Sequence, residues 1–185
     1  MTVVINGTTG ITTPGETNTG TLSVTGIITA SQGVGGTPAF SAYFSGTQSV
    51  SSNTITKVTV NTEVFDTASC FNNTGSTVGG IPAYAFLPNV AGYYQVNFAV
   101  EGSGVASTIQ AINAIPYKNN SIINGITYSY GAYVYPTAVS GGSSTGTILV
   151  YMNGSTDFLE LYGKVIGTTT IFGAGYFSAF FVRSA

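Results

Sequence analysis

Six carboxylates are the groups in this sequence best suited to acid-base or metal chemistry, because the chain contains no histidine. Without imidazole, Ser-His-Asp and Cys-His catalysis and histidine metal sites are excluded. A glycosidase instead needs two carboxyl groups flanking a sugar. An enzymatic function would therefore have to use two of Glu16, Glu63, Asp66, Glu101, Asp157 and Glu160.

The spacing of these acids argues against catalysis. Glu63 and Asp66 are three residues apart, as are Asp157 and Glu160. On a strand, side chains three apart point to opposite faces, so we expect these acids to mark strand ends and to pair with the few cations. Calcium loops of the familiar acid spacing are missing, and the single Cys70 is expected to be a small buried hydrophobe. We therefore predict no catalytic, metal or cofactor site, and a calcium ion at a subunit axis stays open.

Four tyrosines lie close together in the segment 126–135. Tyrosine rings stack on sugars and hydrogen-bond them, so these side chains are candidate glycan contacts. Strand alternation places the first two on one face and the last two on the other, unless Gly131 forms a bulge. Sheet packing and subunit contact are therefore the favoured roles of Tyr128, Tyr130, Tyr133 and Tyr135.

The composition is that of a β protein with very little charge. Charged residues make up 5% of the chain, against about 25% in an ordinary domain. Hydrophobic residues reach 43% and aromatic residues 12%, which excludes a disordered polar tract. Abundant β-branched and aromatic residues, punctuated by 25 glycines, predict strands and turns. Four cations at a net charge of −2 offer no stripe for nucleic acid, and no long apolar run predicts membrane insertion.

Strand patterns recur from Pro38 onward and are bounded by turn residues. Strand starts that lie about ten to twenty residues apart are typical of a sandwich of two antiparallel sheets. The predicted strands are Ala39–Phe44, Val58–Phe65, Ala83–Phe86, Tyr93–Val100, Thr108–Tyr117, Ile126–Tyr135, Thr147–Met152, Phe158–Gly163 and Tyr176–Val182.

The last predicted strand, Tyr176–Val182, is apolar on both of its faces. A sheet with one wet face should alternate apolar and polar residues, as Tyr93–Val100 does. The second apolar face of the last strand is therefore expected to contact another subunit. Candidates for the core or for a trimer interface are Tyr94, Phe98, Tyr176, Phe177, Phe180 and Phe181.

Residues 1–37 differ from residues 38–185. Their short apolar triplets are separated by threonine and glycine, and each is too short to form a core alone. We expect this extended Thr/Gly-rich segment to gain order by pairing with a partner, and thus to serve as an anchor. Its start lacks the basic and apolar regions of a secretory signal, which predicts synthesis in a cytoplasm.

Six segments in order give residues 38–185 a family resemblance. They are Ala39–Ala42, Val60–Thr67, Val90–Asn97, Tyr117–Asn120, Asp157–Leu161 and Tyr176–Val182. On these segments the chain resembles the C1q-like domain, the globular head shared with the tumour-necrosis-factor superfamily. The resemblance implies a ten-stranded antiparallel jelly-roll sandwich that assembles as a homotrimer. Two departures are a loosened turn at Pro88–Gly92 and the lack of a collagen stalk.

Residues 1–37 resemble the Thr/Gly-rich leaders of bacteriophage tail-fibre and other virion proteins. Both resemblances together predict a non-enzymatic structural or adhesive protein on a virion surface, as a tail fibre or as a head fibre or capsid decoration. Its expected partners are itself, other virion proteins through residues 1–37, and a host surface glycan or receptor. The alternative function is that of a soluble or cell-surface C1q-like binding module. A polysaccharide-degrading enzyme is the third class of function considered.

Overall fold

The computed structural model describes residues 37–104, 109–123, 133–139, 141–168 and 170–184. Within these ranges the chain forms strands and no α-helix, which confirms the all-β prediction. None of the described residues therefore belongs to a helix long and apolar enough to span a membrane. The strands are β1 (Ala39–Phe44), β2 (Gln48–Val50), β3 (Thr56–Lys57), β4 (Thr62–Asp66), β5 (Phe71–Asn72), β6 (Ala85–Phe86), β7 (Gly92–Gly104), β8 (Ile109–Lys118), β9 (Ser121–Ile122), β10 (Tyr133–Val139), β11 (Gly141–Met152), β12 (Leu159–Ile166) and β13 (Thr170–Arg183).

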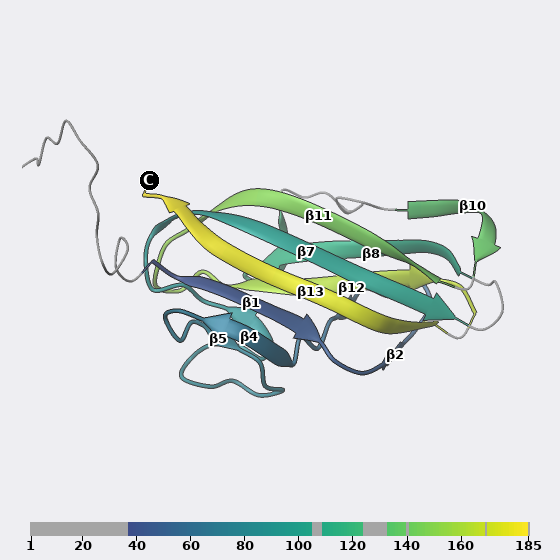
Figure 1. The fold of residues 1–185 in the computed structure, drawn as a ribbon, viewed down its shortest axis with the longest axis horizontal. Helices are drawn as coiled ribbons and strands as arrows, with labels where there is room; N and C mark the ends of the chain where they lie inside the picture. The colour runs from purple at the N-terminus through teal and green to yellow at the C-terminus, as the bar shows by residue number, and fades with distance from the viewer. Residues whose placement is uncertain (1–36, 105–108, 124–132, 140, 169, 185) are drawn as a thin grey trace, which may run out of the picture. The chain divides into compact units, whose positions relative to one another are not determined.

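The strands form two antiparallel sheets that pack face to face (Figure 1). Sheet A has the order β11-β7-β13-β1-β4, with β2 beside β13. Sheet B has the order β10-β8-β12-β6-β5, with β3 beside β12 and β9 beside β8. The long strands cross repeatedly between the sheets, from β7 to β8, from β10 to β11 and from β12 to β13. This crossing pattern confirms the predicted jelly roll.

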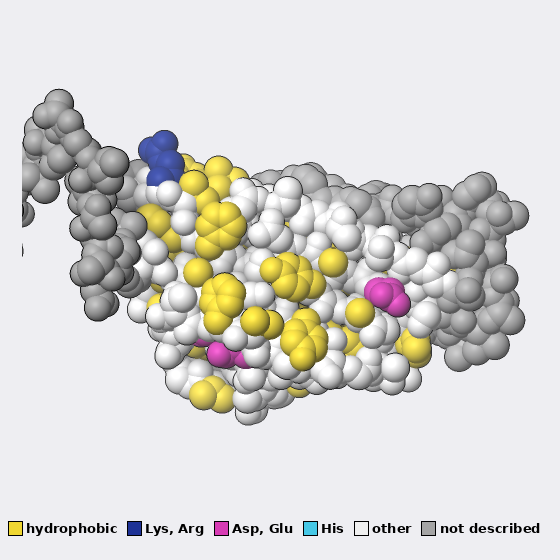
Figure 2. All heavy atoms as spheres, in the orientation of Figure 1, with side chains coloured by type: hydrophobic (Ala, Val, Ile, Leu, Met, Phe, Trp, Pro, Cys, Tyr) yellow, Lys and Arg dark blue, Asp and Glu magenta, His cyan; other side chains and the backbone are white. Residues whose placement is uncertain are grey.

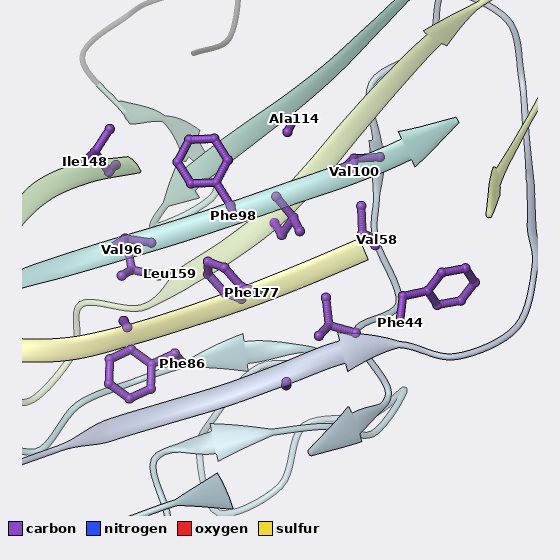
Figure 3. Packing of buried hydrophobic residues seen from close by; sticks show 14 of the residues in the cluster. Phe44, Val58, Phe86, Val96, Phe98, Val100, Ala114, Ile148, Leu159 and Phe177 are labelled. Atoms are coloured by element: carbon purple, nitrogen blue, oxygen red, sulfur yellow. The ribbon is translucent and has the colours of Figure 1, made fainter. Parts of the chain in front are cut away.

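The centre of sheet A follows the alternation expected from the sequence. In β7, Tyr94, Val96, Phe98 and Val100 are buried between the sheets. The residues between them point outward and are only partly covered. In Figure 3, Phe98 of β7 and Phe177 of the neighbouring β13 project into the same layer of buried side chains.

An aromatic cluster around Phe40 links the two sheets. The Phe40 ring of β1 stacks on Phe71 of β5 and on Phe86 of β6, each at a centroid distance of 4.5 Å. It also meets the edge of Phe177 of β13 at 5.1 Å. Phe86 continues the contacts to Tyr94 at 5.8 Å. Because Phe40 and Phe177 belong to sheet A and Phe71 and Phe86 to sheet B, this cluster joins the layers.

The predicted strand Val58–Phe65 is wrong as a single element. The chain leaves sheet B after β3 and enters sheet A at β4, and Val58 and Val60 are buried at the crossing. Val58 N–H donates to the Leu161 carbonyl at 2.9 Å, and Val60 N–H donates to the Val58 carbonyl at 3.0 Å. The second bond spans only two residues and turns the chain, so the run of β-branched residues bends between the sheets.

Several other strands are longer or shorter than the sequence predicted, because their ends depend on pairing with neighbouring strands. β7, β11 and β13 extend well beyond their predicted ends because β7 pairs along its length with β11 on one side and with β13 on the other. In the predicted strand Ile126–Tyr135, residues 126–132 lie outside the described residues, and β10 runs from Tyr133 to Val139. Pro136 fits there because β10 is an edge strand of sheet B. The sequence pattern did not indicate β2, β3, β5 or β9, each of two or three residues.

Removing the Phe98 ring should destabilise the sandwich strongly. We expect Phe98→Ala to lower the free energy of unfolding by about 3–5 kcal/mol, because the ring is fully buried and leaves a cavity. Val64→Ala on the exposed side of β4 is the control and should cost less than about 1 kcal/mol. Chemical denaturation of both variants checks this, and a loss below about 1 kcal/mol for Phe98→Ala would contradict the core described above.

Candidate interaction face

The six aromatic residues predicted for the core or an interface divide between two environments. Tyr94, Phe98 and Phe177 lie inside the sandwich. Phe181 is partly buried and packs on Tyr94 at a centroid distance of 5.5 Å. The other two, Tyr176 and Phe180, point away from the core of the chain and are 42% and 47% exposed.

Tyr176 and Phe180 belong to an aromatic surface on the outside of sheet A. Antiparallel pairing sets Tyr176 of β13 opposite Tyr43 of β1, and Ser41 of β1 opposite Phe65 of β4. Figure 2 shows hydrophobic side chains spread across this side of the molecule, with charged ones toward its margins. We call this surface the outer face of sheet A, and its exposed apolar side chains are Tyr43, Phe65, Leu149, Tyr151, Tyr176 and Phe180.

A row of uncharged polar side chains runs across the middle of the same face. The Gln95 amide donates to the Thr147 hydroxyl, which donates to Asn97 Oδ1 at 2.8 Å. Asn97 Nδ2 in turn donates to the Ser178 hydroxyl at 3.4 Å. One position further, Ser41 Oγ donates to the Tyr176 hydroxyl at 3.4 Å. These polar groups are hydrogen-bonded to one another, and none of them is ionised. Another protein surface can therefore cover this row at a low cost in desolvation free energy.

The sequence indicated only part of this face. The doubly apolar β13 pointed to Tyr176 and Phe180, but Tyr43 and Phe65 were not singled out. Tyr43 could have been found by alternation, because Phe40, Ala42 and Phe44 point inward and leave Tyr43 outward. Phe65 could not, since its direction depends on a register shift between β1 and β4 at Ser41 and Ala42.

The proposed glycan-contact tyrosines are only partly within the structure. Tyr133 and Tyr135 lie in β10 at the edge of sheet B. Tyr128 and Tyr130 lie outside the described residues. Their assignment as glycan contacts stays a prediction.

The expectation that Glu63 and Asp66 point to opposite faces is wrong. The register shift between β1 and β4 pairs Asp66 with Phe40 and Glu63 with Ala42, and both partners point into the sandwich. Glu63 and Asp66 therefore turn to the same side of β4, where they line one cleft. The extra residue in the bulged strand reverses the alternation on which the expectation rested.

Glu160 and Asp157 each form an ion pair with a lysine, Glu160 with Lys57 and Asp157 with Lys118. Glu160 of β12 is buried, and one of its oxygens lies 2.5 Å from Lys57 Nζ of β3. The stacked rings of Tyr117 and Tyr162, 4.0 Å apart, lie beside it. Burial, and then the nearby Glu160 carboxylate, raise the pKa of both phenols.

Asp157 ties the end of β11 to the turn after β8. Its carboxylate lies 2.8 Å from Lys118 Nζ and accepts bonds from Asn119 Nδ2 at 2.8 Å and from Asn153 N–H at 2.9 Å. Asn119 Oδ1 accepts the Phe158 N–H at 2.9 Å and closes the network. Burial alone would raise the pKa of Asp157, but these donors outweigh it and hold the pKa below the ordinary value of 3.8.

No metal centre forms among the described residues, since no three acidic or cysteine side chains gather there. Cys70 is buried, and burial raises the pKa of its thiol, so the side chain is a poor nucleophile and a packing residue. Asp157 and Glu160 hold the chain together through Lys118 and Lys57 and do not converge on one site.

No protein-family model and no curated protein matches the sequence. Solved structures do match the fold. The globular domain of a zebrafish complement 1qA protein is 12% identical with a TM-score of 0.52 and covers 81% of this chain and 100% of its own. The PRD1 vertex protein P5 is 15% identical at a TM-score of 0.47, with 80% and 100% covered, and an Eiger TNF from S. frugiperda is 14% identical at 0.47, with 80% and 95% covered. The chain has the C1q/TNF-type jelly-roll fold that its motifs predicted.

Removing the charge of Asp157 should lower the free energy of unfolding at neutral pH. We expect Asp157→Asn to cost about 1–3 kcal/mol, because three donors lose a charged acceptor. The folded pKa is lowered, so the stabilisation is complete above the unfolded value and is lost as pH falls through the folded value.

Urea denaturation at about pH 7 and about pH 3 checks this linkage. The stability difference between wild type and Asp157→Asn should be largest at neutral pH and should shrink in acid. Glu101→Gln, at an exposed position of β7, should change stability by less than about 0.5 kcal/mol at either pH. A difference between wild type and Asp157→Asn that is constant with pH would contradict the ion-pair account.

Proposed function

We propose that this protein is a structural or adhesive component of a virion surface, built from a homotrimeric C1q-like head that residues 1–37 attach to the particle. The head projects outward as a tail fibre that contacts the host, or as a head fibre or decoration on the capsid. The observation that carries the trimer is the outer face of sheet A, which presents Tyr43, Phe65, Tyr176 and Phe180 to solvent in a single chain.

Such a face suits contact between copies. Aromatic side chains bury a large apolar area at low entropic cost and are enriched at the centres of protein interfaces, from which charged residues are depleted. A face that meets a different surface on the next copy closes into a ring when the rotation fits threefold symmetry. The side chains of Gln95, Thr147, Asn97 and Ser178 are hydrogen-bonded to one another. A subunit that covers them therefore does not leave these buried polar groups without hydrogen-bond partners.

The virion role is supported by the Thr/Gly-rich character of residues 1–37 and by the near absence of charge. A surface solvated by hydroxyl and amide groups responds little to salt and pH, because it does not depend on ion pairs. That property suits a particle exposed to changing surroundings.

A binding or building role fits the state of the acids better than catalysis does. Asp66 Oδ1 accepts Ala68 N–H at 3.1 Å, and Oδ2 accepts Phe71 N–H at 2.7 Å, so both oxygens serve the turn after β4. Asp157 and Glu160 are held in ion pairs. A glycosidase needs two free carboxyl groups across one sugar, and the described acids do not provide such a pair.

A charge placed on the outer face of sheet A should break the trimer. Sedimentation equilibrium of the wild-type protein should give a mass near three times 18.9 kDa. Phe180→Asp should give folded monomer, because the side chain is exposed in the single chain but its charge would be buried in the interface. Val78→Asp, at an exposed apolar residue off sheets A and B, should stay trimeric. A monomeric wild type at micromolar concentration would refute the trimer.

Deleting residues 1–37 should separate attachment from folding. The head should still fold and trimerise, because its strands carry the core, whereas the short apolar triplets of the Thr/Gly-rich segment offer little apolar area to bury without a partner. The assay is the incorporation of full-length and truncated protein into particles, with circular dichroism and sedimentation of the truncated head as controls. Normal incorporation without residues 1–37 would rule out the anchor.

A further inference from the structure

A cleft of about 350 Å³ lies between β4 and the loop of residues 72–82 that follows β5. β4 is the last strand of sheet A and β5 is the last strand of sheet B, and the chain runs directly from one to the other. In Figure 1 both strands lie at the lower margin of the sandwich. The volume lies within the range of roughly 300–1,000 Å³ typical of small-molecule sites.

One wall of the cleft is acidic because of the bulge in β4. The shifted register brings Glu63 and Asp66 to the same side of the strand, and both line the cleft. Both carboxylate oxygens of Asp66 accept hydrogen bonds from the backbone, one from Ala68 N–H and one from Phe71 N–H, so this side chain has a structural role. Glu63 is exposed and lines the cleft, and its carboxylate makes no hydrogen bond or ion pair within the described residues, so the carboxylate oxygens are free to accept from a ligand.

The opposite wall is a loop that Asn72 holds closed. The two hydrogens of the buried Asn72 Nδ2 are shared among three carbonyls, those of Ser76 at 2.7 Å, Ile81 at 2.9 Å and Pro82 at 3.0 Å. Its Oδ1 accepts from the N–H and the hydroxyl of Thr74, at 2.9 and 2.7 Å. One amide thus ties both ends of the loop together, and the wall is formed before any ligand arrives. A preformed wall spares the ordering cost that weakens binding by loose loops.

The lining combines apolar surface with a few free polar groups. Phe71, Val78 and Ile81 supply carbon surface, and Val78 is more than half exposed. Ser69 and Asn73 line the same cleft, and neither side chain has a hydrogen-bond partner within the described residues. No lysine or arginine contributes to the lining.

This lining selects its ligand by charge and by hydrogen-bonding capacity. A free carboxylate accepts hydrogen bonds and donates none, so the ligand must bring donors to Glu63. An anionic ligand would meet a like charge with no cation to offset it. A compact molecule with many hydroxyl groups and a C–H face matches the alternation of Glu63, Asn73 and apolar carbon. That description fits an uncharged sugar.

We propose that the cleft between β4 and the 72–82 loop binds an uncharged saccharide, with Glu63 and Asn73 as its hydrogen-bonding residues and Val78 and Ile81 as its apolar floor. The inference deepens the adhesive role proposed above, on which its biological meaning rests. Glu63 points to the inner side of β4, away from the outer face of sheet A, so the cleft does not use the surface assigned to the trimer.

Saturation-transfer NMR and calorimetry on the full-length protein test the proposal with defined probes. The neutral probes are maltotriose, cellotriose and N-acetylated chitotriose, and the charged controls are trigalacturonic acid and trilysine. At least one neutral trisaccharide should bind with a Kd of about 1 mM or tighter, and at least about fivefold more tightly than either charged control.

Variants locate the binding. Glu63→Gln and Asn73→Ala should each weaken the preferred neutral probe by at least about fivefold, whereas Glu101→Gln, an exposed acid outside the cleft, should leave it unchanged. Circular dichroism confirms folding of each variant. The proposal is overturned by no neutral binding at about 10 mM, by preferred binding of either charged probe, or by unchanged affinity in both cleft variants.

Sedimentation of the same samples measures their oligomeric state, so that a failure of the saccharide site can be told apart from a failure of the proposed trimer. A trimer that binds no saccharide would refute the cleft assignment alone. Saccharide binding by a monomer would refute the trimer and leave the cleft in place. Hydrolysis of the bound trisaccharide, lost in Glu63→Gln, would instead make the cleft catalytic and overturn its assignment as a binding site.

Discussion

The stacking of Phe40 against Phe71 and Phe86 is the contact on which the remaining architecture depends. It joins β1 of sheet A to two very short strands of sheet B, which have little hydrogen bonding of their own. Through Phe177 it also sets β1 against β13. With β1 placed in this way, β4 pairs with the side of β1 that faces away from β13 and becomes the last strand of sheet A. The outer face of sheet A and the cleft beside β4 both follow from that position.

Buried and partly buried amides and carboxylates fix the turns of a chain that has very few charges. Asn72 closes the loop after β5, Asp66 caps the turn after β4, and Asp157 joins the turns after β8 and β11. Each satisfies several backbone or side-chain groups, which is what a buried polar group needs in order to be tolerated. These hydrogen bonds and ion pairs hold the loops of the jelly roll in the described residues.

The motifs that suggested the family resemblance turn out to be partners in space. Ala39–Ala42 pairs with 177–180 in register, and Asn119 of the motif 117–120 donates to Asp157 of the motif 157–161. Tyr94 donates to the Val90 carbonyl within the motif 90–97 at 2.8 Å. Contacts between these segments explain why they can indicate one fold together, although one solved structure with this fold is only 12% identical.

The sequence by itself determined the all-β class, the inward residues of β7 and the doubly apolar strand β13, because these depend on composition and on a period of two. It could not place Glu63 and Asp66 together, show that Val58 and Val60 cross between sheets, or bring Phe65 to the outer face. Each of those depends on a bulge or a bend: the extra residue in β4 changes the side to which the neighbouring side chains point, and the hydrogen bond between Val60 and Val58 bends the chain between the sheets. The interaction face and the cleft were therefore decided by the tertiary structure, since pairing with β1 sets the register of β4 and local pattern does not.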